Sequence, residues 1–493
     1  MTNSTKKIAV VGAGLAGLAV AVRLKHLGFQ VTVFEKQATY GGKIFEFTQH
    51  GYRFDKGPSL FTEPWELEQL FSAVNDDASK YFSFKKIDTA CHYFFSDRTT
   101  LRFSGNLDNL KNEVENKISA EDARHVVSYL ADSKKTYERI GTFFISQKAF
   151  TWRDIFKKEL LLRYPWFLSS RMTKSLHAFN SGRFKNDKLV KIFDRFGTYN
   201  GSNPYQMSGI YSTIPHLEHN TGTWFPDRGM RDIVDSVYKL AVKNGVEFRF
   251  NQQIQEVALH GDFYTLVSDK TEKFNGVVCA IDHLVFYRDL LKDDVQFRKF
   301  EKQERSSSGL VFYWGIKRKF KELHLHNIMF SEDYQKEFDQ IFKDKKIPED
   351  PTVYIHISSV ANETDAPTGC QNWFVMINTP AGIFLNESEI SAVKNKLLEK
   401  IAFHLGEDIR PYIETESYWT AKDLEIETGS FQGALYGASS NHKLAAIKRH
   451  KNTIKKYPRI YFCGGTVHPG GGIPLVLRSA RIVSEIIQHD TTI

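Results

Sequence analysis

Glycines near both ends of the chain have the spacing of nucleotide-binding turns. Near the N-terminus, Gly12, Gly14 and Gly17 form a GxGxxG pattern directly after the apolar residues 8–11. The first glycine permits a tight turn, the second lets the backbone approach a pyrophosphate, and the third lets the next helix pack closely on the strand. Ala16 lies in the same turn, where the helix N-terminus would offer N–H groups to phosphate oxygens. The pattern therefore predicts a dinucleotide-binding turn.

The elements around this turn support that interpretation. Residues 8–11 have the composition of a buried parallel strand, residues 18–27 are typical of a helix, and residues 30–34 alternate like a second strand. Glu35 ends that strand 23 residues after Gly12, and its carboxylate can accept hydrogen bonds from ribose hydroxyls. A secretory signal is the alternative for the first apolar residues, but the glycine spacing favours the nucleotide-binding turn.

Two further glycine loops extend the predicted binding surface. Gly41 and Gly42 follow Glu35 after a short loop, and a second glycine loop occupies residues 51–59. Each loop alone would be an ordinary surface turn. FAD, unlike NAD, reaches beyond the strand ends and needs further backbone contacts, so the two loops together favour FAD as the cofactor. The contacts predicted from this part of the chain are Lys36, Gly42, Lys43, Pro58, Ser59 and Leu60.

A second group of glycines follows a predicted strand near the C-terminus. Residues 459–463 read as the strand, and residues 475–487 read as the helix after the glycines. Glycine lets the backbone lie against a flat ring, and a proline at a helix start loses no hydrogen bond. The helix dipole would then stabilise a reduced, anionic flavin, although a purely structural turn is the alternative. The predicted contacts are Gly464, Gly465, His468, Gly472, Ile473 and Pro474.

Together these motifs resemble those of the bacterial carotenoid (phytoene-type) desaturases, FAD enzymes related to the amine-oxidase-like flavoproteins. The resemblance extends along most of the chain, and residues 436–441 and 464–472 look most like the hydroxycarotenoid 3,4-desaturase branch. It implies FAD as the cofactor, a carotenoid as the substrate, and Ile254 as the residue whose backbone meets the adenine. Arg228 departs from the pattern, which places a glycine before Gly229, and could alter the flavin loop or lie on the surface.

The resemblance and the predicted elements together imply an α/β fold. A Rossmann-like FAD-binding domain is expected beside a mixed-sheet substrate domain and a helical, membrane-facing subdomain. A hairpin over residues 92–95 and 100–103 and strands over 310–316, 353–358 and 373–378 would form the mixed sheet. The expected divisions are 1–85, 225–300 and 426–493 for FAD binding, 86–140, 191–224 and 301–425 for the substrate domain, and 141–190 for the helical subdomain.

The positive charge of the chain is concentrated in one aromatic-rich stretch. The net charge is +8, from 66 basic and 58 acidic residues, and residues 141–185 hold nine Lys or Arg against two acids. Such cations beside aromatic and leucine residues favour a peripheral contact with an anionic membrane, and a solvated amphipathic helix pair is the alternative. The four cysteines form no CxxC pair, so we expect a reducing, cytoplasmic location and no metal site. We expect no nucleic-acid partner.

The proposed chemistry places weak demands on the protein. Loss of a hydride to flavin and of a proton from the next carbon would add a double bond to a polyene, with oxygen or a quinone as the final electron acceptor. Glu218 is the predicted base, because a carboxylate in an apolar tunnel has a raised pKa, and His216, His219 and His468 compete for the role. The alternatives are phytoene desaturation, carotenoid isomerisation, amine oxidation, and a non-catalytic flavin- or lipid-binding role.

Overall fold

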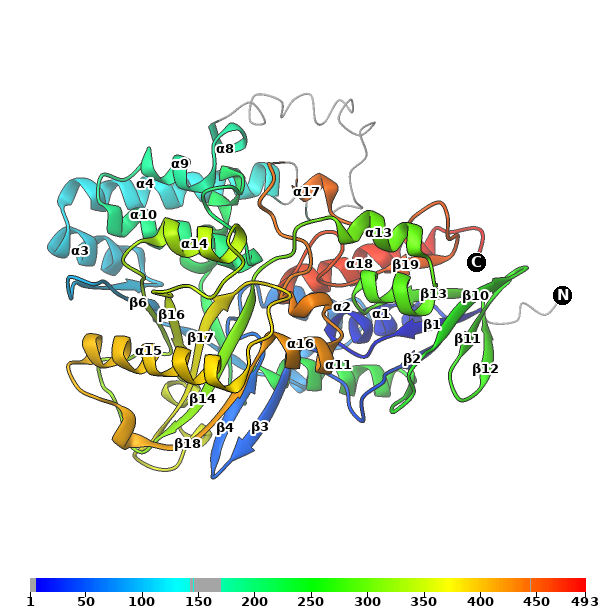
Figure 1. Cartoon of the computed structure of the whole chain (residues 1–493). Coiled ribbons are helices and arrows are strands. Elements are labelled where there is room, and N and C mark those ends of the chain that lie inside the picture. Colours follow the sequence, from blue (N-terminus) through cyan, green and yellow to red (C-terminus); the bar gives the residue numbers. More distant parts are fainter. Residues whose placement is uncertain (1–5, 142–144, 146–169, 444) are drawn as a thin grey trace.

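A five-stranded parallel sheet joins segments that lie far apart in the sequence. The structure is a computed structural model, and it describes residues 6–141, 145, 170–443 and 445–493 (Figure 1). The strand order β19–β13–β1–β2–β9 places the first strand of the chain at the centre. The strands are β1 (Lys7–Val11), β2 (Gln30–Phe34), β9 (Glu247–Arg249), β13 (Gly276–Cys279) and β19 (Ile460–Phe462).

Both faces of this sheet are covered, as a parallel sheet requires. Alternate residues of β1 point to opposite faces, so Ile8 and Val10 join one apolar cluster while Ala9 and Val11 join another. The first cluster includes residues of α2 (Trp65–Ser72) and of three longer helices, and the second includes residues of a three-stranded antiparallel sheet. The longer helices are α1 (Leu15–His26), α11 (Arg231–Lys243) and α18 (Ile473–Gln488); the strands are β10 (Glu256–His260), β11 (Phe263–Val267) and β12 (Thr271–Phe274).

A second, seven-stranded sheet lies beside the first, in the order β18–β14–β17–β16–β15–β6–β7 (Figure 1). All neighbouring strands are antiparallel except β15 and β6, so the mixed sheet and its predicted hairpin are confirmed. Its strands are β6 (Thr89–Phe94), β7 (Thr100–Ser104), β14 (Ser308–Ile316), β15 (His326–Met329), β16 (Val353–His356), β17 (Gln371–Thr379) and β18 (Ile413–Trp419). Two small sheets pair β3 (Phe45–Gln49) with β4 (Tyr52–Lys56), and β5 (Phe84–Ile87) with β8 (Thr223–Pro226).

Alternation along these strands gives the seven-stranded sheet two different faces. On β17, Trp373, Val375 and Ile377 pack in a cluster with residues of the long helix α15 (Glu387–Leu405). Between them, Phe374 and Met376 face the other way and line a cavity. Helix α15 therefore seals one face of the sheet and leaves the other face for a ligand.

Helices cover the β6–β7 end of this sheet. One apolar cluster joins β6 and β7 to residues of α3 (Leu107–Lys117), α4 (Ala120–Thr136), α9 (Leu176–Ser181), α10 (Asp187–Asp194) and α14 (Tyr334–Phe342) (Figure 1). Among residues 6–141, 145, 170–443 and 445–493, no helix is long and apolar enough to cross a bilayer. The remaining α-helices of the described residues are α8 (Ser170–Thr173), α12 (His283–Val285), α13 (Asp294–Glu301), α16 (Ala421–Thr428) and α17 (Ala445–Lys448).

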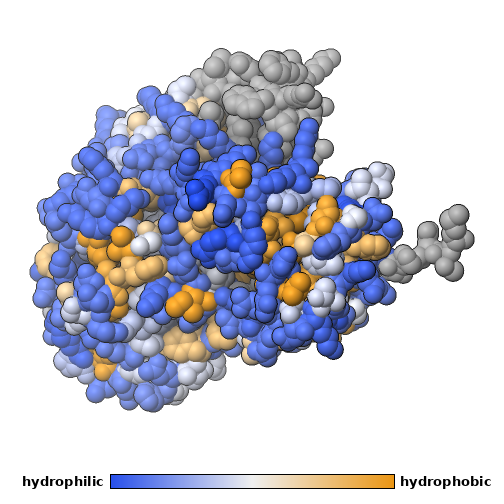
Figure 2. Space-filling model, turned by 45° about the vertical axis from the view of Figure 1, so that its right-hand side comes forward, coloured by the Kyte–Doolittle hydropathy of each residue, from blue (hydrophilic) through white to orange (hydrophobic). Residues whose placement is uncertain are grey.

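The predicted membrane-facing subdomain falls mostly on residues 142–144 and 146–169, which lie outside the described residues. The strands of the parallel sheet come from residues 7–34, 247–279 and 460–462, whereas those of the mixed sheet come from 89–104 and 308–419. The domain boundaries themselves stay predictions. On the face shown in Figure 2, the surface is mainly hydrophilic and its hydrophobic residues lie in several separate groups.

Candidate functional site

The first glycine turn folds as its spacing predicts. Gly12 follows β1 with a φ of +104°, a conformation that L side chains rarely adopt. A Cβ on Gly17 would lie 1.9 Å from the carbonyl oxygen of Gly12, so glycine at this position lets α1 pack against the turn. Gly14 precedes α1 and has no side chain that could cap the helix. The first N–H groups of α1 therefore stay available to phosphate oxygens.

Glu35 lies beside this turn, directly after β2. One of its carboxylate oxygens accepts a hydrogen bond from the Ala13 N–H at 2.8 Å, and the other accepts one from the Gln37 N–H at 3.0 Å. A carboxylate has about four acceptor positions, so both oxygens retain capacity for ribose hydroxyls.

The loop that holds Gly41 and Gly42 approaches the first turn closely. Gly41 forms an isolated bridge with Gly14, and its N–H donates to the carbonyl oxygen of Ala13 at 3.0 Å. A Cβ on Gly42 would lie 3.0 Å from the Cα of Gly14, and Gly42 has a φ of +61°. Both the spacing and the backbone conformation favour glycine here, as expected of a loop that must approach a ligand.

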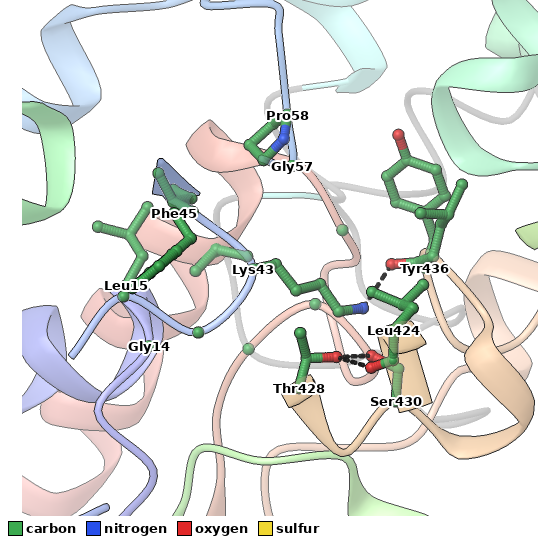
Figure 3. Close-up of a pocket in the computed structure, with 18 of the residues that line it drawn as sticks. Gly14, Leu15, Lys43, Phe45, Gly57, Pro58, Leu424, Thr428, Ser430 and Tyr436 are labelled. Atoms are coloured by element: carbon green, nitrogen blue, oxygen red, sulfur yellow. Dashed lines mark hydrogen bonds between the residues drawn. The ribbon is translucent and has the colours of Figure 1, made fainter. Parts of the chain in front are cut away.

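Lys43 extends from that loop toward the segment that carries Tyr436 (Figure 3). Its Nζ donates to the carbonyl oxygens of Leu435 at 2.7 Å and Ala434 at 3.4 Å. Burial lowers the pKa of Lys43 to about 8, against the opposing effect of the Asp282 carboxylate. The two hydrogen bonds therefore hold the ammonium group in place, and its charge is sensitive to pH near neutrality.

The C-terminal glycines meet the N-terminal turn because β19 pairs with β13, which pairs with β1. A Cβ on Gly464 would lie 3.4 Å from the Cβ of Ala16, and the Gly464 N–H donates to Ser479 Oγ at 3.0 Å. Gly472 precedes α18 with a φ of +104°, and Pro474 lies in the first turn of that helix. The predicted convergence of the two glycine segments is confirmed.

One cavity of about 1100 Å³ extends from these turns to the seven-stranded sheet. Its volume reaches the upper end of the roughly 300–1,000 Å³ of ordinary ligand pockets. Glycine turns form one part of its wall, and the sheet forms another. The described residues that face it from the sheet are Gly309 and Val311 of β14, Phe374, Met376 and Asn378 of β17, Tyr354 of β16, His326 and Ile328 of β15, Ala90 and Cys91 of β6, and Trp419 of β18.

All the predicted cofactor residues except Gly17 and His468 line this cavity. They are Gly12, Gly14, Ala16, Glu35, Lys36, Gly42, Lys43, Pro58, Ser59, Leu60, Ile254, Gly464, Gly465, Gly472, Ile473 and Pro474. Gly17 performs the packing role that was predicted for it, away from the cavity. His468 was expected against the ring, but it is buried elsewhere, with its carbonyl accepting from Asn452 and Ser479.

Arg228, which departs from the family pattern, lies on the surface. Its guanidinium pairs with Asp232 one helical turn further on, and 63% of its side chain is exposed. Arg228 is not one of the described residues that line the cavity. The surface alternative for Arg228 is therefore confirmed.

Glu218 lines the cavity, but the expectation of a raised pKa is wrong. One carboxylate oxygen accepts a hydrogen bond from Arg195 Nη2 at 2.5 Å, and the other accepts one from the Tyr199 hydroxyl. Burial pushes the pKa of Glu218 upward, but the charge of Arg195 and the hydrogen bonds from Arg195 and Tyr199 outweigh burial, so the pKa lies below its ordinary value. Glu218 is an ionised partner in a buried ion pair.

None of the three competing histidines is among the described residues that line the cavity. His216 and His219 are buried on the π-helical turn η6 (His216–Asn220), which also carries Glu218. Burial lowers the pKa of His219 to about 4 and lowers that of His216, so both are neutral near pH 7. Among the four predicted bases, all of which the structure describes, Glu218 alone reaches the cavity.

Several polar residues of the wall were not predicted from the sequence. Arg195 and Tyr199 come from the short helix η4 (Arg195–Asn200), His326 from β15 and Tyr354 from β16. No motif marks these residues. The available signal was weak: Arg195 follows Asp194 in a mixed stretch between Phe193 and Phe196.

The wall fits a dinucleotide that ends in a flat ring. Closely spaced glycine backbones, an acid beside the first turn and the N-terminal residues of both α1 and α18 all line the same space. A side chain at Gly14, Gly42 or Gly464 would enter that space or press on its opposite wall. These features match the requirements of the pyrophosphate, the ribose and the ring in turn.

Comparison with known proteins agrees with this geometry. Residues 15–488 match the family described as flavin containing amine oxidoreductase. The chain is 44% identical to a 1-hydroxycarotenoid 3,4-desaturase of Flavobacterium sp. (strain P99-3), across 98% of this chain and 99% of that protein. It is 28% identical to a 4,4'-diapolycopene oxygenase of Methylomonas sp, across 99% of each chain.

Solved structures share the fold at low sequence identity. A triple mutant of putrescine oxidase superposes with a TM-score of 0.65 and 13% identity, across 99% of each chain. An oxidoreductase from Methanosarcina mazei superposes with a TM-score of 0.64 and 14% identity, across 97% of this chain and 100% of that one. The family match covers nearly the whole chain: it begins at Leu15, within the first glycine turn, and includes the whole C-terminal glycine segment. The chain therefore belongs to the flavin containing amine oxidoreductase family and is an FAD-dependent oxidoreductase.

Proposed function

We propose that this protein is a carotenoid desaturase that introduces the 3,4 double bond of a 1-hydroxycarotenoid such as hydroxy-γ-carotene, within carotenoid biosynthesis. The observation that carries the proposal is a cavity that continues from the dinucleotide turns across one face of the mixed sheet. The proposal is supported by the 44% identity to a protein of that name over nearly the whole of both chains.

The reaction removes a hydride from one carbon and a proton from its neighbour, and the remaining electron pair forms the double bond. Bound FAD supplies the acceptor for the hydride. The carbon that loses the hydride is allylic to the polyene, so its positive charge is delocalised and the neighbouring proton becomes acidic. For the final acceptor of the two electrons we propose a quinone or molecular oxygen.

Residues of the chain would position the two reactants. The backbones of Gly14, Gly42 and Gly464 allow the cofactor to approach closely, while Glu35 is placed to bind ribose. On the other side, apolar residues of the sheet such as Val311 and Met376 exclude water and lie along the path of a long polyene. Holding the allylic carbon beside the ring is the main contribution expected of the protein.

We still propose Glu218 as the proton acceptor, but as a carboxylate with a lowered rather than a raised pKa. Its lowered pKa means that it is ionised at neutral pH, and deprotonation of a carbon next to a delocalised cation needs only a weak base. Both of its oxygens already accept hydrogen bonds from Arg195 and Tyr199, so the same carboxylate also holds these side chains in place.

We further propose that the protein acts at the cytoplasmic face of the membrane, as a peripheral protein. The support is the sequence of residues 141–185, where nine cationic residues alternate with aromatic and leucine side chains. A carotenoid substrate dissolves in the bilayer, so a bound enzyme would receive it directly.

The test is anaerobic mixing of the purified FAD-loaded protein with hydroxy-γ-carotene. We expect bleaching of the flavin absorption, a red shift of the carotenoid spectrum, and a mass lower by two hydrogens. Phytoene, lycopene and putrescine are the comparison substrates. Reaction with phytoene alone, isomerisation at constant mass, or hydrogen peroxide formed from the amine would each overturn the proposal in favour of a different activity.

A further inference from the structure

A small polar cluster interrupts the apolar part of the cavity wall. It consists of Arg195, Tyr199, Glu218 and His326, all of which line the cavity. Exposed fractions are 7% for Arg195, 1% for Glu218 and 2% for His326. Burial of an ion pair costs desolvation energy that the attraction between the two charges does not reliably offset. A charged pair beside a space suited to hydrocarbon therefore calls for a functional reason.

Two nitrogen atoms of this cluster have no hydrogen-bond partner among the described residues. Arg195 uses Nη2 for Glu218 at 2.5 Å, but its Nε–H is unpaired. His326 shares a hydrogen bond of 2.7 Å between Nδ1 and the Tyr354 hydroxyl, but its Nε2 is unpaired. Buried polar atoms nearly always have a partner, so two unpaired nitrogens on residues that line a cavity point to a polar ligand.

Burial keeps His326 neutral, which sets what its free nitrogen can do. Its pKa is lowered to about 4 by burial, with the Glu218 charge opposing and the Arg195 charge adding to that effect. A neutral imidazole carries one donor and one acceptor nitrogen, and the tautomer follows from the Tyr354 hydroxyl. The Arg195 Nε–H and the free His326 Nε2 belong to two residues that line the same cavity, and together they offer two sites to a group that can both donate and accept a hydrogen bond.

The cluster is also connected to the loop predicted to contact FAD. The Tyr354 hydroxyl lies 2.8 Å from Ser59 Oγ, so two hydrogen bonds link Ser59 to His326. In a 1-hydroxycarotenoid the carbon that bears oxygen lies only two bonds from C3, where the new double bond begins. A hydroxyl-binding site for this substrate must therefore lie close to the cofactor, as this cluster does.

We propose that Arg195 and His326 bind the substrate hydroxyl and thereby select hydroxylated over unhydroxylated carotenoids; the inference rests on the proposed function. Arg195 Nε–H donates to the hydroxyl oxygen, and the hydroxyl forms a second hydrogen bond with His326 Nε2. An unhydroxylated carotenoid leaves both buried nitrogens unpaired, and sites built to pair with a hydroxyl reject analogues that lack it. Glu218 and Tyr354 act as positioning residues for these two side chains.

The test compares hydroxy-γ-carotene with γ-carotene on the FAD-loaded protein. Arg195→Lys keeps a cation for Glu218 but removes the Nε–H, and His326→Phe keeps a ring but removes both nitrogens. For each variant we expect the ratio of kcat/KM between the two carotenoids to fall about 10- to 100-fold, the range of a lost charged or buried hydrogen bond. Dissociation constants, measured from the change in carotenoid absorption, should shift in the same direction.

A matched control is available in a second buried ion pair. Arg478 pairs with Glu63 at 2.5 Å and is absent from the described cavity wall. Arg478→Lys should lower stability without changing the substrate ratio. An unchanged ratio in both cluster variants would overturn the inference while leaving the desaturase proposal standing. Failure of hydroxy-γ-carotene to reduce the wild-type flavin would instead refute the desaturase proposal.

Discussion

At the scale of single residues, the buried charge of Glu218 should couple folding to pH. Its folded pKa lies below the ordinary value, so its stabilising effect is present above an unfolded pKa of about 4.3 and is lost as pH falls through the folded value. Glu218→Gln leaves the Arg195 charge buried without a charged partner, and it should lower the free energy of unfolding by about 3–5 kcal/mol at pH 7. Thermal unfolding from pH 3 to 7 checks this. The difference in Tm should narrow at the acid end, and parallel profiles would contradict the argument.

Loss of the Lys43 charge should weaken FAD binding as pH rises. Its pKa of about 8 means that the ammonium is charged at neutral pH and is lost as pH rises through that value. A cation on the wall favours the anionic dinucleotide, so Lys43→Met should weaken FAD binding about tenfold at pH 7, or on the order of 1.4 kcal/mol.

Titration of the FAD-free protein with FAD between pH 6 and 9 measures this effect. The wild-type affinity should approach that of Lys43→Met as pH rises, while the variant should vary less. Lys43→Arg serves as the control because arginine stays charged over the whole range. Equal pH dependence in all three proteins would show that another group is responsible.

At the scale of elements, the contact between two glycine turns should be essential for the cofactor. A Cβ on Gly42 would meet the Gly14 backbone at 3.0 Å, and the φ of +61° already disfavours a side chain. Gly42→Ala should therefore yield a folded but nearly colourless protein. Gly28→Ala is the control, since Gly28 has a φ of +92° but no atom within 4 Å of the added Cβ. Flavin content per protein, measured by absorption, distinguishes the two, and equal loss in both would point to general misfolding.

Elements with a strong local pattern were predicted well from the sequence. The helix predicted from residue 18 begins at Leu15, and the one predicted from residue 475 begins at Ile473, because a glycine precedes each helix in place of a side-chain cap. Most strands of the two sheets were predicted in this way, but β15 and β18 were not, and β18 carries two glutamates among its seven residues. Local periodicity records which face of an element is buried, and this information needs no knowledge of the partner.

The polar part of the wall could not be predicted in the same way. Arg195, Glu218 and His326 come from three short segments whose meeting depends on packing between the helices and the mixed sheet. The raised pKa expected for Glu218 assumed an apolar environment, whereas an arginine 23 positions away supplies the dominant neighbour. Long-range pairing of charges leaves no trace in local spacing.

At the scale of the whole molecule, the two sheets have different roles. The parallel sheet brings the chain's two ends together around the dinucleotide turns, and the mixed sheet supplies a broad wall for the substrate. A polyene that enters this cavity must come from a lipid phase. Membrane contact through residues 141–185 is therefore the property that the proposed function most requires of the molecule's exterior.

Binding to vesicles tests that requirement. We expect the protein to sediment with phosphatidylcholine vesicles that contain phosphatidylglycerol, and to bind pure phosphatidylcholine vesicles much more weakly. Each cation near an anionic surface contributes about 1 kcal/mol, so replacing Lys157, Lys158 and Arg163 by glutamine should weaken binding roughly 100-fold at low salt. High salt should reduce wild-type binding, because screening shortens the reach of these charges. Replacing the exposed Lys343, Lys345 and Lys346 by glutamine removes the same charge elsewhere. If both triple variants lose affinity equally, net charge rather than the 141–185 segment directs the protein to the membrane.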